Sequence, residues 1–135
     1  MPYIAQVAEG KRAELEVFGD DYPTPDGTGV RDYIHVMDLA RGHAAALDFL
    51  TSNSGWHAVN LGTGVGYSVL EMVKAFEVVC GSHIPYRVTS RRTGDVAECY
   101  ADRRKAASLL NWTAKHTLAE MCSSVWRFQS LVANK

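Results

Sequence analysis

A polar loop between two apolar segments constrains the fold of this chain more than any other feature. It lies in the stretch Val17–Asp38, which reads VFGDDYPTPDGTGVRDYIHVMD. Two prolines restrict the backbone angle φ of this loop and two glycines free it, so the loop has a defined shape. Long irregular segments inside a compact domain are usually binding loops or lids. We therefore expect a ligand-binding loop between a strand at Leu15–Gly19 and a strand at Arg31–Ile34.

Arg31 stands where this loop rejoins regular structure. A guanidinium at such a position can bind an anion through two parallel hydrogen bonds. The alternative is a surface arginine that pairs with Asp26 or Asp32, and the spacing alone favours this alternative.

The rest of the chain alternates helical and extended segments, which is typical of an α/β fold with about four to five helices and short strands. Apolar periodicity and capping residues predict helices at Pro2–Glu9, Val36–Leu50, from the capping box Ser68–Glu71 to Gly81, from Asp102 to Leu110, and after the capping box Thr117–Glu120. The side chains of the last helix that should point to the core are Leu118, Met121, Cys122, Val125 and Trp126. Further strands are expected at Ile84–Thr89 and at Trp56–Leu61, whose near-continuous apolar residues favour burial on both faces of a parallel sheet.

Composition excludes several classes of function. The 135 residues are enough for one domain with a real core, and a net charge of −1 gives no reason to expect nucleic acid or an anionic membrane as partner. No apolar run approaches the roughly 18 residues of a membrane span. The three cysteines form no CxxC pair, so we expect neither a disulfide framework nor a zinc site, and a reducing cytoplasm fits best.

Two candidate motifs do not carry chemistry. Gly62–Gly66 has the spacing GxGxG rather than GxGxxG and no acidic residue about 20 positions later, so we interpret it as a tight turn and not a dinucleotide site. His35, Asp38 and His43 do not have the spacing of converging metal ligands and are expected to be supporting or surface groups. The remaining histidines are isolated in the sequence, and no role is assigned to His57, His83 and His116.

Five segments together resemble a known family. They are MPYIAQVAEG, VFGDDYPTPDGTGVRDYIHVMDLARGH, VNLGTGVGYSVLEMV, RRTGDVAECYAD and LNWTAKHTLAEMCSSVWRFQ. They are similar to the UDP-galactose 4-epimerases (UDP-glucose 4-epimerases), NAD-dependent enzymes of the extended short-chain dehydrogenase/reductase superfamily. The resemblance implies that residues 1–135 are one unit: the carboxyl-terminal, substrate-binding part of a Rossmann-type fold, with late elements of its sheet. The amino-terminal, NAD-binding part would be absent.

The same resemblance implies a UDP-sugar site, with UDP-glucose or UDP-galactose as ligand. Backbone groups of Glu16, Val17 and Phe18 would contact the uracil, Phe18 most directly, and Asp95 would accept hydrogen bonds from the ribose hydroxyls. Without the resemblance, Arg91 and Arg92 would be a solvated basic pair and Asp95 the charge that balances it.

Three more residues complete the site that the resemblance implies. Arg31 and Arg92 would hold the diphosphate. Cys99 would lie near the hexose, where a thiol leaves more room than a phenol and would admit the 2-acetamido group of N-acetylated UDP-hexoses. A buried structural cysteine is an equally good interpretation of Cys99.

The catalytic pair of the superfamily, Tyr-x-x-x-Lys, is missing, because none of the six tyrosines has a lysine four residues later. By this comparison the chain would bind no NAD and would not epimerise C4 of UDP-hexoses alone. The alternative is a non-catalytic UDP-binding or assembly piece. A strand at Ala58–Leu61 without its neighbouring strands would leave an unpaired apolar edge, so we expect the chain to self-associate. For the whole epimerases the resemblance implies a homodimer.

Overall fold

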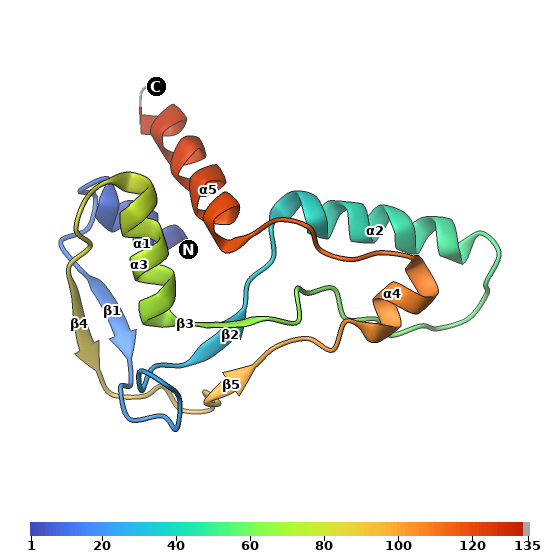
Figure 1. Cartoon of the computed structure of the whole chain (residues 1–135), viewed down its shortest axis with the longest axis horizontal. Coiled ribbons are helices and arrows are strands. Elements are labelled where there is room, and N and C mark those ends of the chain that lie inside the picture. Colours follow the sequence, from blue (N-terminus) through green and yellow to red (C-terminus); the bar gives the residue numbers. More distant parts are fainter. Residues whose placement is uncertain (134–135) are drawn as a thin grey trace.

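The computed structural model describes residues 1–133, which form five helices and five strands (Figure 1). In chain order these are α1 (Pro2–Ala8), β1 (Leu15–Phe18), β2 (Val30–Asp32), α2 (Val36–Leu50), β3 (Gly66–Ser68), α3 (Val69–Cys80), β4 (Tyr86–Thr89), β5 (Glu98–Cys99), α4 (Arg104–Leu110) and α5 (Leu118–Ala133). The expectation of an α/β fold with short strands is confirmed.

The larger core lies where α1, α3 and α5 pack beside a two-stranded parallel sheet of β1 and β4. Phe76 of α3 is fully buried there, and its ring meets the Trp126 ring of α5 edge to face, with centroids 6.2 Å apart. Other members of this core are Ile4, Ala5, Val7, Leu15, Val17, Met72, Val73, Ile84 and Cys122. The core therefore holds β1 in place from one face.

A second sheet has the strand order β3-β2-β5 and connects this core to α2 and α4 at the other end of the molecule (Figure 1). Strand β2 runs antiparallel to β3 and parallel to β5, and the register sets Arg31 opposite both Tyr67 and Cys99. A smaller core of Ala106, Leu110 and Trp112 lies at the α2–α4 end.

Local signals predicted the helices correctly. Ser68 Oγ accepts from the backbone N–H of Glu71, Glu71 binds back to the N–H of Ser68, and Gly81 ends α3 in the left-handed region at φ 71°. The same reciprocal bonds join Thr117 and Glu120 before α5. Asp102 lies one position before the N-cap of α4, which is Arg103. The side chain and the backbone N–H of Arg104 donate hydrogen bonds to the Asp102 carboxylate and lower its pKa to about 2.

The prediction of a strand at Trp56–Leu61 is wrong. Within residues 1–133 this segment pairs with no strand, and Trp56 is 88% exposed. A parallel strand exists only if a neighbour completes its hydrogen-bond ladder, and apolar composition cannot supply one. The short strands β3 and β5 were not predicted, and β2 ends at Asp32 rather than Ile34, because two or three residues are too few for a periodicity signal.

No helix in residues 1–133 has both the length and the apolar character needed to cross a bilayer. Over the same residues no three His, Cys, Asp or Glu side chains are grouped so that they could hold a metal ion.

Candidate functional site

The candidate site lies where the carboxyl ends of β1 and β4 meet. Parallel strands end at the same edge of a sheet, so the loops that leave them start side by side. Here loop 19–29 follows β1 and loop 90–97 follows β4, and the N–H of Gly19 donates to the carbonyl of Thr89 at 2.8 Å. A cavity of about 220 Å³ opens between these loops and β2.

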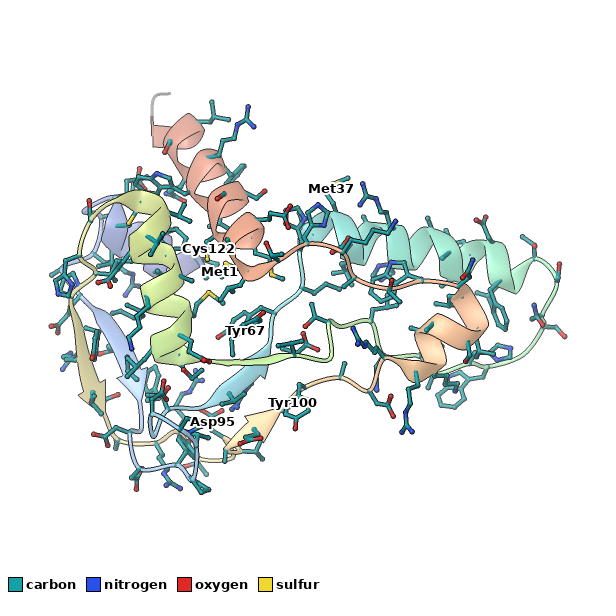
Figure 2. The ribbon with its side chains drawn as sticks, viewed as in Figure 1. Met1, Met37, Tyr67, Asp95, Tyr100 and Cys122 are labelled. Atoms are coloured by element: carbon teal, nitrogen blue, oxygen red, sulfur yellow. The ribbon has the colours of Figure 1, made fainter. Side chains whose placement is uncertain are left out.

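Six of the seven residues that the sequence suggested line this cavity, namely Glu16, Val17, Phe18, Arg31, Arg92 and Asp95. Asp95 lies low in the molecule, beside the start of β5 (Figure 2). Cys99 is outside the lining but is the register partner of Arg31 and is exposed. The interpretation of Cys99 as a buried cysteine is therefore wrong.

One edge of β1 faces away from its partner strand. The N–H groups of Leu15 and Gly19 donate to carbonyls at Pro85 and Thr89, beside and at the end of β4. Because backbone groups alternate in direction along a strand, the N–H and C=O groups of Glu16 and Phe18 point to the opposite edge. Within residues 1–133 that edge has no strand partner, so it offers donors and acceptors to a ligand.

Two guanidinium groups meet at one carboxylate in the cavity. Arg92 Nε donates to Asp95 Oδ2 at 3.0 Å and its guanidinium lies over the Phe18 ring, 4.5 Å from the ring centre. Arg31 Nη2 lies 3.7 Å from Asp95 Oδ1, and Nη1 donates to the carbonyl of Val30 at 2.7 Å. With two cations beside one anion, this corner of the cavity favours a further anion.

The simpler interpretation of Arg31, a pair with Asp26 or Asp32, is wrong because both carboxylates have other partners. Asp26 Oδ1 accepts from the N–H and the hydroxyl of Thr28, and its other oxygen binds Ser68. These bonds tie loop 19–29 to the start of α3.

Asp32 instead holds the glycine-rich turn 62–66. Its carboxylate accepts from the N–H groups of Thr63, Gly64 and Ala101 at 3.0–3.2 Å and from the Thr63 hydroxyl. A Cβ on Gly62 would lie 2.5 Å from Asp32 Oδ2. The turn therefore locks β2 beside the end of β5 and keeps Arg31 and Cys99 together.

Sequence reasoning missed five other residues of the cavity wall, which are Tyr3, Tyr22, Gly29, Tyr33 and Val69. Tyr3 belongs to α1 and Val69 to α3, so no local pattern connects them with the loop. Tyr33 is half-buried, and burial raises the pKa of its phenol although Arg31 opposes this. A signal was present only for Tyr22, an aromatic residue inside an otherwise polar loop.

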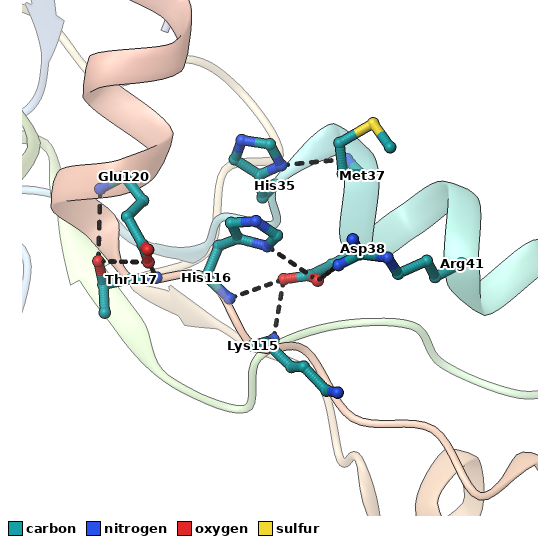
Figure 3. A network of polar contacts seen from close by, with 8 residues as sticks. All are labelled: His35, Met37, Asp38, Arg41, Lys115, His116, Thr117 and Glu120. Atoms are coloured by element: carbon teal, nitrogen blue, oxygen red, sulfur yellow. Dashed lines mark hydrogen bonds and ion pairs between the residues drawn. The ribbon is translucent and has the colours of Figure 1, made fainter.

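All three histidines described above as isolated have partners, and Asp38 is not a surface group. His57 Nε2 lies 3.2 Å from the Ser54 carbonyl, and its ring meets that of Phe49 edge to face. His116 Nδ1 lies 2.9 Å from Asp38, which is 1% exposed, and the His116 ring stacks on that of His35 with centroids 4.1 Å apart (Figure 3). His83 lies 2.7 Å from Glu77. These groups support the fold away from the cavity.

Comparison with known proteins identifies the family. The family model described as GDP-mannose 4,6 dehydratase matches residues 1–125. The chain is 61% identical to UDP-glucose 4-epimerase of Bacillus subtilis over 99% of its own length and 40% of that protein.

Two solved structures are similar over 98% of the chain. They are the UDP-glucose 4-epimerase of Stenotrophomonas maltophila with bound NAD and formylated UDP-arabinopyranose (51% identity, TM-score 0.95, 40% of that chain) and that of Bifidobacterium longum with NAD+ and UDP (53%, 0.94, 39%). The chain thus spans about 40% of the length of these relatives and corresponds to their carboxyl-terminal part. It belongs to the family described by the GDP-mannose 4,6 dehydratase model, within the extended short-chain dehydrogenase/reductases, and the relatives named here, at 51–61% identity, are UDP-glucose 4-epimerases.

Proposed function

We propose that this chain is the UDP-sugar-binding part of an NAD-dependent UDP-hexose 4-epimerase and that the cavity between loops 19–29 and 90–97 receives the UDP group. The observation that carries the proposal is the convergence of Arg31 and Arg92 on Asp95, opposite the free edge of β1. The similarity to epimerases whose structures hold UDP or a UDP-sugar supports it.

The free edge of β1 suits uracil. The base has an N–H donor between two carbonyl acceptors, and a strand edge offers carbonyls and N–H groups in alternation. Uracil would bind the backbone groups of Glu16 and Phe18, whereas the backbone groups of Val17, between them, point to β4. Specificity then comes from the hydrogen-bond pattern of the pyrimidine edge and not from side-chain charge.

The arginine pair suits a diphosphate. Each guanidinium presents a planar fork that matches two phosphate oxygens, and such charge-assisted bonds are about twice as strong as neutral ones. Both guanidinium groups lie beside the Asp95 carboxylate. With the diphosphate bound, Asp95 would be released to accept from the ribose hydroxyls.

NAD does not fit the glycine-rich turn of this chain. A helix-opening turn holds a pyrophosphate with free N–H groups, but those of Thr63 and Gly64 already donate to Asp32. The space beside Gly62 is filled by Asp32 and Ala101. We therefore assign no cofactor to this chain and expect no epimerisation by it alone, since its sequence also lacks the Tyr-x-x-x-Lys pair.

Calorimetric titration with UDP tests the site. Arg31→Ala is expected to weaken UDP binding about tenfold or more, because it removes charge-assisted bonds to phosphate. ADP should give much less heat, since its base cannot match the β1 edge. Arg104→Ala, which removes an exposed arginine paired with Asp102, is the matched control and should bind UDP normally. Equal binding of ADP, or normal binding by Arg31→Ala, would contradict the proposal.

Cys99 extends the proposal to the sugar. Its exposed thiol lies across the β2–β5 ladder from Arg31, where the hexose would follow a diphosphate held by Arg31. A small side chain here leaves space for a 2-acetamido group. In the same titration, Cys99→Tyr should weaken binding of UDP-N-acetylglucosamine more than binding of UDP-glucose.

The second candidate function is that of an assembly piece. Apolar side chains are exposed along α2 and the segment after it, with Val36 and Leu47 each 68% exposed and Trp56 88%. Exposed apolar area of this kind promotes association. We expect the mass from light scattering to rise with concentration, and Leu47→Lys to reduce that rise. A constant monomer mass over a wide concentration range would rule this out.

A further inference from the structure

The two consecutive arginines of loop 90–97 point to different partners. Arg92 lies over Phe18 and pairs with Asp95 inside the candidate site. Arg91 turns to loop 19–29 instead: Nε donates to Asp21 Oδ1 at 2.6 Å and Nη2 donates to the Asp21 carbonyl at 2.5 Å. One side chain therefore binds both a carboxylate and a backbone group of the opposite loop.

Arg91 also covers a wall of the cavity. Its guanidinium carbon lies 4.1 Å from the centre of the Tyr22 ring, which lines the cavity and is 6% exposed. Gly19 fits beneath these two side chains, since a Cβ there would lie 2.7 Å from Arg91 Cγ and 2.8 Å from Tyr22 Cε2. The Tyr22 hydroxyl is buried and has no hydrogen-bond partner among the described residues, so packing under Arg91, and not a bond of its own, holds the ring.

We propose that Arg91 is a positioning residue that moors loop 19–29 to loop 90–97 and so keeps the cavity ready for the nucleotide. The inference rests on the proposed function in naming the nucleotide as ligand. Arg91 need not touch the ligand. It acts by holding Tyr22 and by fixing the backbone immediately before Arg92, so that less ordering is required when the diphosphate binds.

An ordinary surface ion pair would not have this effect. Asp21 is largely exposed, and such a pair contributes little by itself because water screens it. The mooring differs because the same guanidinium stacks on a buried ring, and cation–π contacts of arginine add to the pair. The carboxylate and carbonyl contacts fix the plane of the guanidinium over that ring.

The test compares Arg91→Met, which keeps the aliphatic stem, with Arg91→Lys, which keeps the charge. Hydrogen–deuterium exchange of residues 19–29 should become about tenfold faster in Arg91→Met, since the loop opens locally more often. UDP affinity should fall about three- to tenfold. Arg91→Lys should recover part of both effects. Arg104→Met, which removes an arginine paired with Asp102 outside both loops, should change neither.

The results separate the inference about Arg91 from the proposed UDP-binding function. Unchanged exchange in Arg91→Met overturns the mooring, and faster exchange with unchanged UDP affinity overturns its role in positioning. If the wild-type chain binds no UDP, the proposed function fails, while the exchange comparison still decides whether Arg91 moors the loop.

Discussion

Replacing Asp38 by alanine is expected to lower the free energy of unfolding by about 3–5 kcal/mol. The carboxylate accepts from the backbone N–H groups of Lys115 and His116, each at 2.9 Å, and Arg41 lies 3.6 Å away (Figure 3). Alanine leaves two N–H groups and the His116 imidazole without their buried partner. The segment before α5 then loses its attachment to the first turn of α2.

The effect of Asp38 depends on pH. Burial raises the pKa of Asp38, but the backbone N–H and imidazole of His116 and the N–H of Lys115 outweigh burial and hold the pKa below its ordinary value of 3.8. A carboxyl group whose folded-state pKa is depressed stabilises the fold above its unfolded pKa and loses this effect as the pH falls through the folded-state pKa. The difference in free energy of unfolding between wild type and Asp38→Ala should therefore be largest near neutral pH and become smaller in strong acid.

Urea unfolding of both proteins near neutral pH and in strong acid tests this prediction. Asp48→Ala is the matched control, because Asp48 is an exposed aspartate of the same helix, and its loss should change stability by less than about 0.5 kcal/mol. Asp38→Asn, which keeps one acceptor oxygen, should be intermediate. Equal stability of Asp38→Ala and Asp48→Ala would show that the buried carboxylate does not hold the segment before α5.

Phe76→Ala is expected to cost about 3–5 kcal/mol, as truncation of a buried aromatic side chain leaves a cavity that close packing cannot refill. Phe76 is 0% exposed at the centre of the core formed by α1, α3, α5 and β1, and its ring meets Trp126. Because β1 lines the candidate site, UDP binding should weaken as the folded fraction falls.

Val78→Ala on the same helix provides the comparison, since Val78 is 84% exposed and its truncation should change stability by less than about 0.5 kcal/mol. Urea unfolding followed by tryptophan fluorescence measures both variants. Losses of similar size at the two positions would mean that the core is not centred on Phe76.

Much of the site could be anticipated from sequence, but its contacts could not. The resemblance to epimerases pointed to residues at 16–18, 31, 92 and 95, and these six line one cavity. The partner of Arg31 was misjudged, because Asp26 and Asp32 are near in sequence whereas Asp95 is near only after β2 and loop 90–97 come together. The sequence predicts Arg91 as half of a solvated basic pair, whereas in the fold its guanidinium stacks on the Tyr22 ring.

The sequence by itself determined the helices of this protein. Ser68 with Glu71, Gly81, and Thr117 with Glu120 act on backbone groups three or four residues away, so their effect is present in the order of residues. The sequence also indicated the strands β1, β2 and β4, at Leu15–Phe18, Val30–Asp32 and Tyr86–Thr89. Only the tertiary structure decided β3, β5 and the site. Trp56–Leu61 forms no strand and β5 forms one of two residues, because a strand depends on hydrogen-bond partners that are distant in sequence. A guanidinium likewise takes the carboxylate or ring that folding brings beside it.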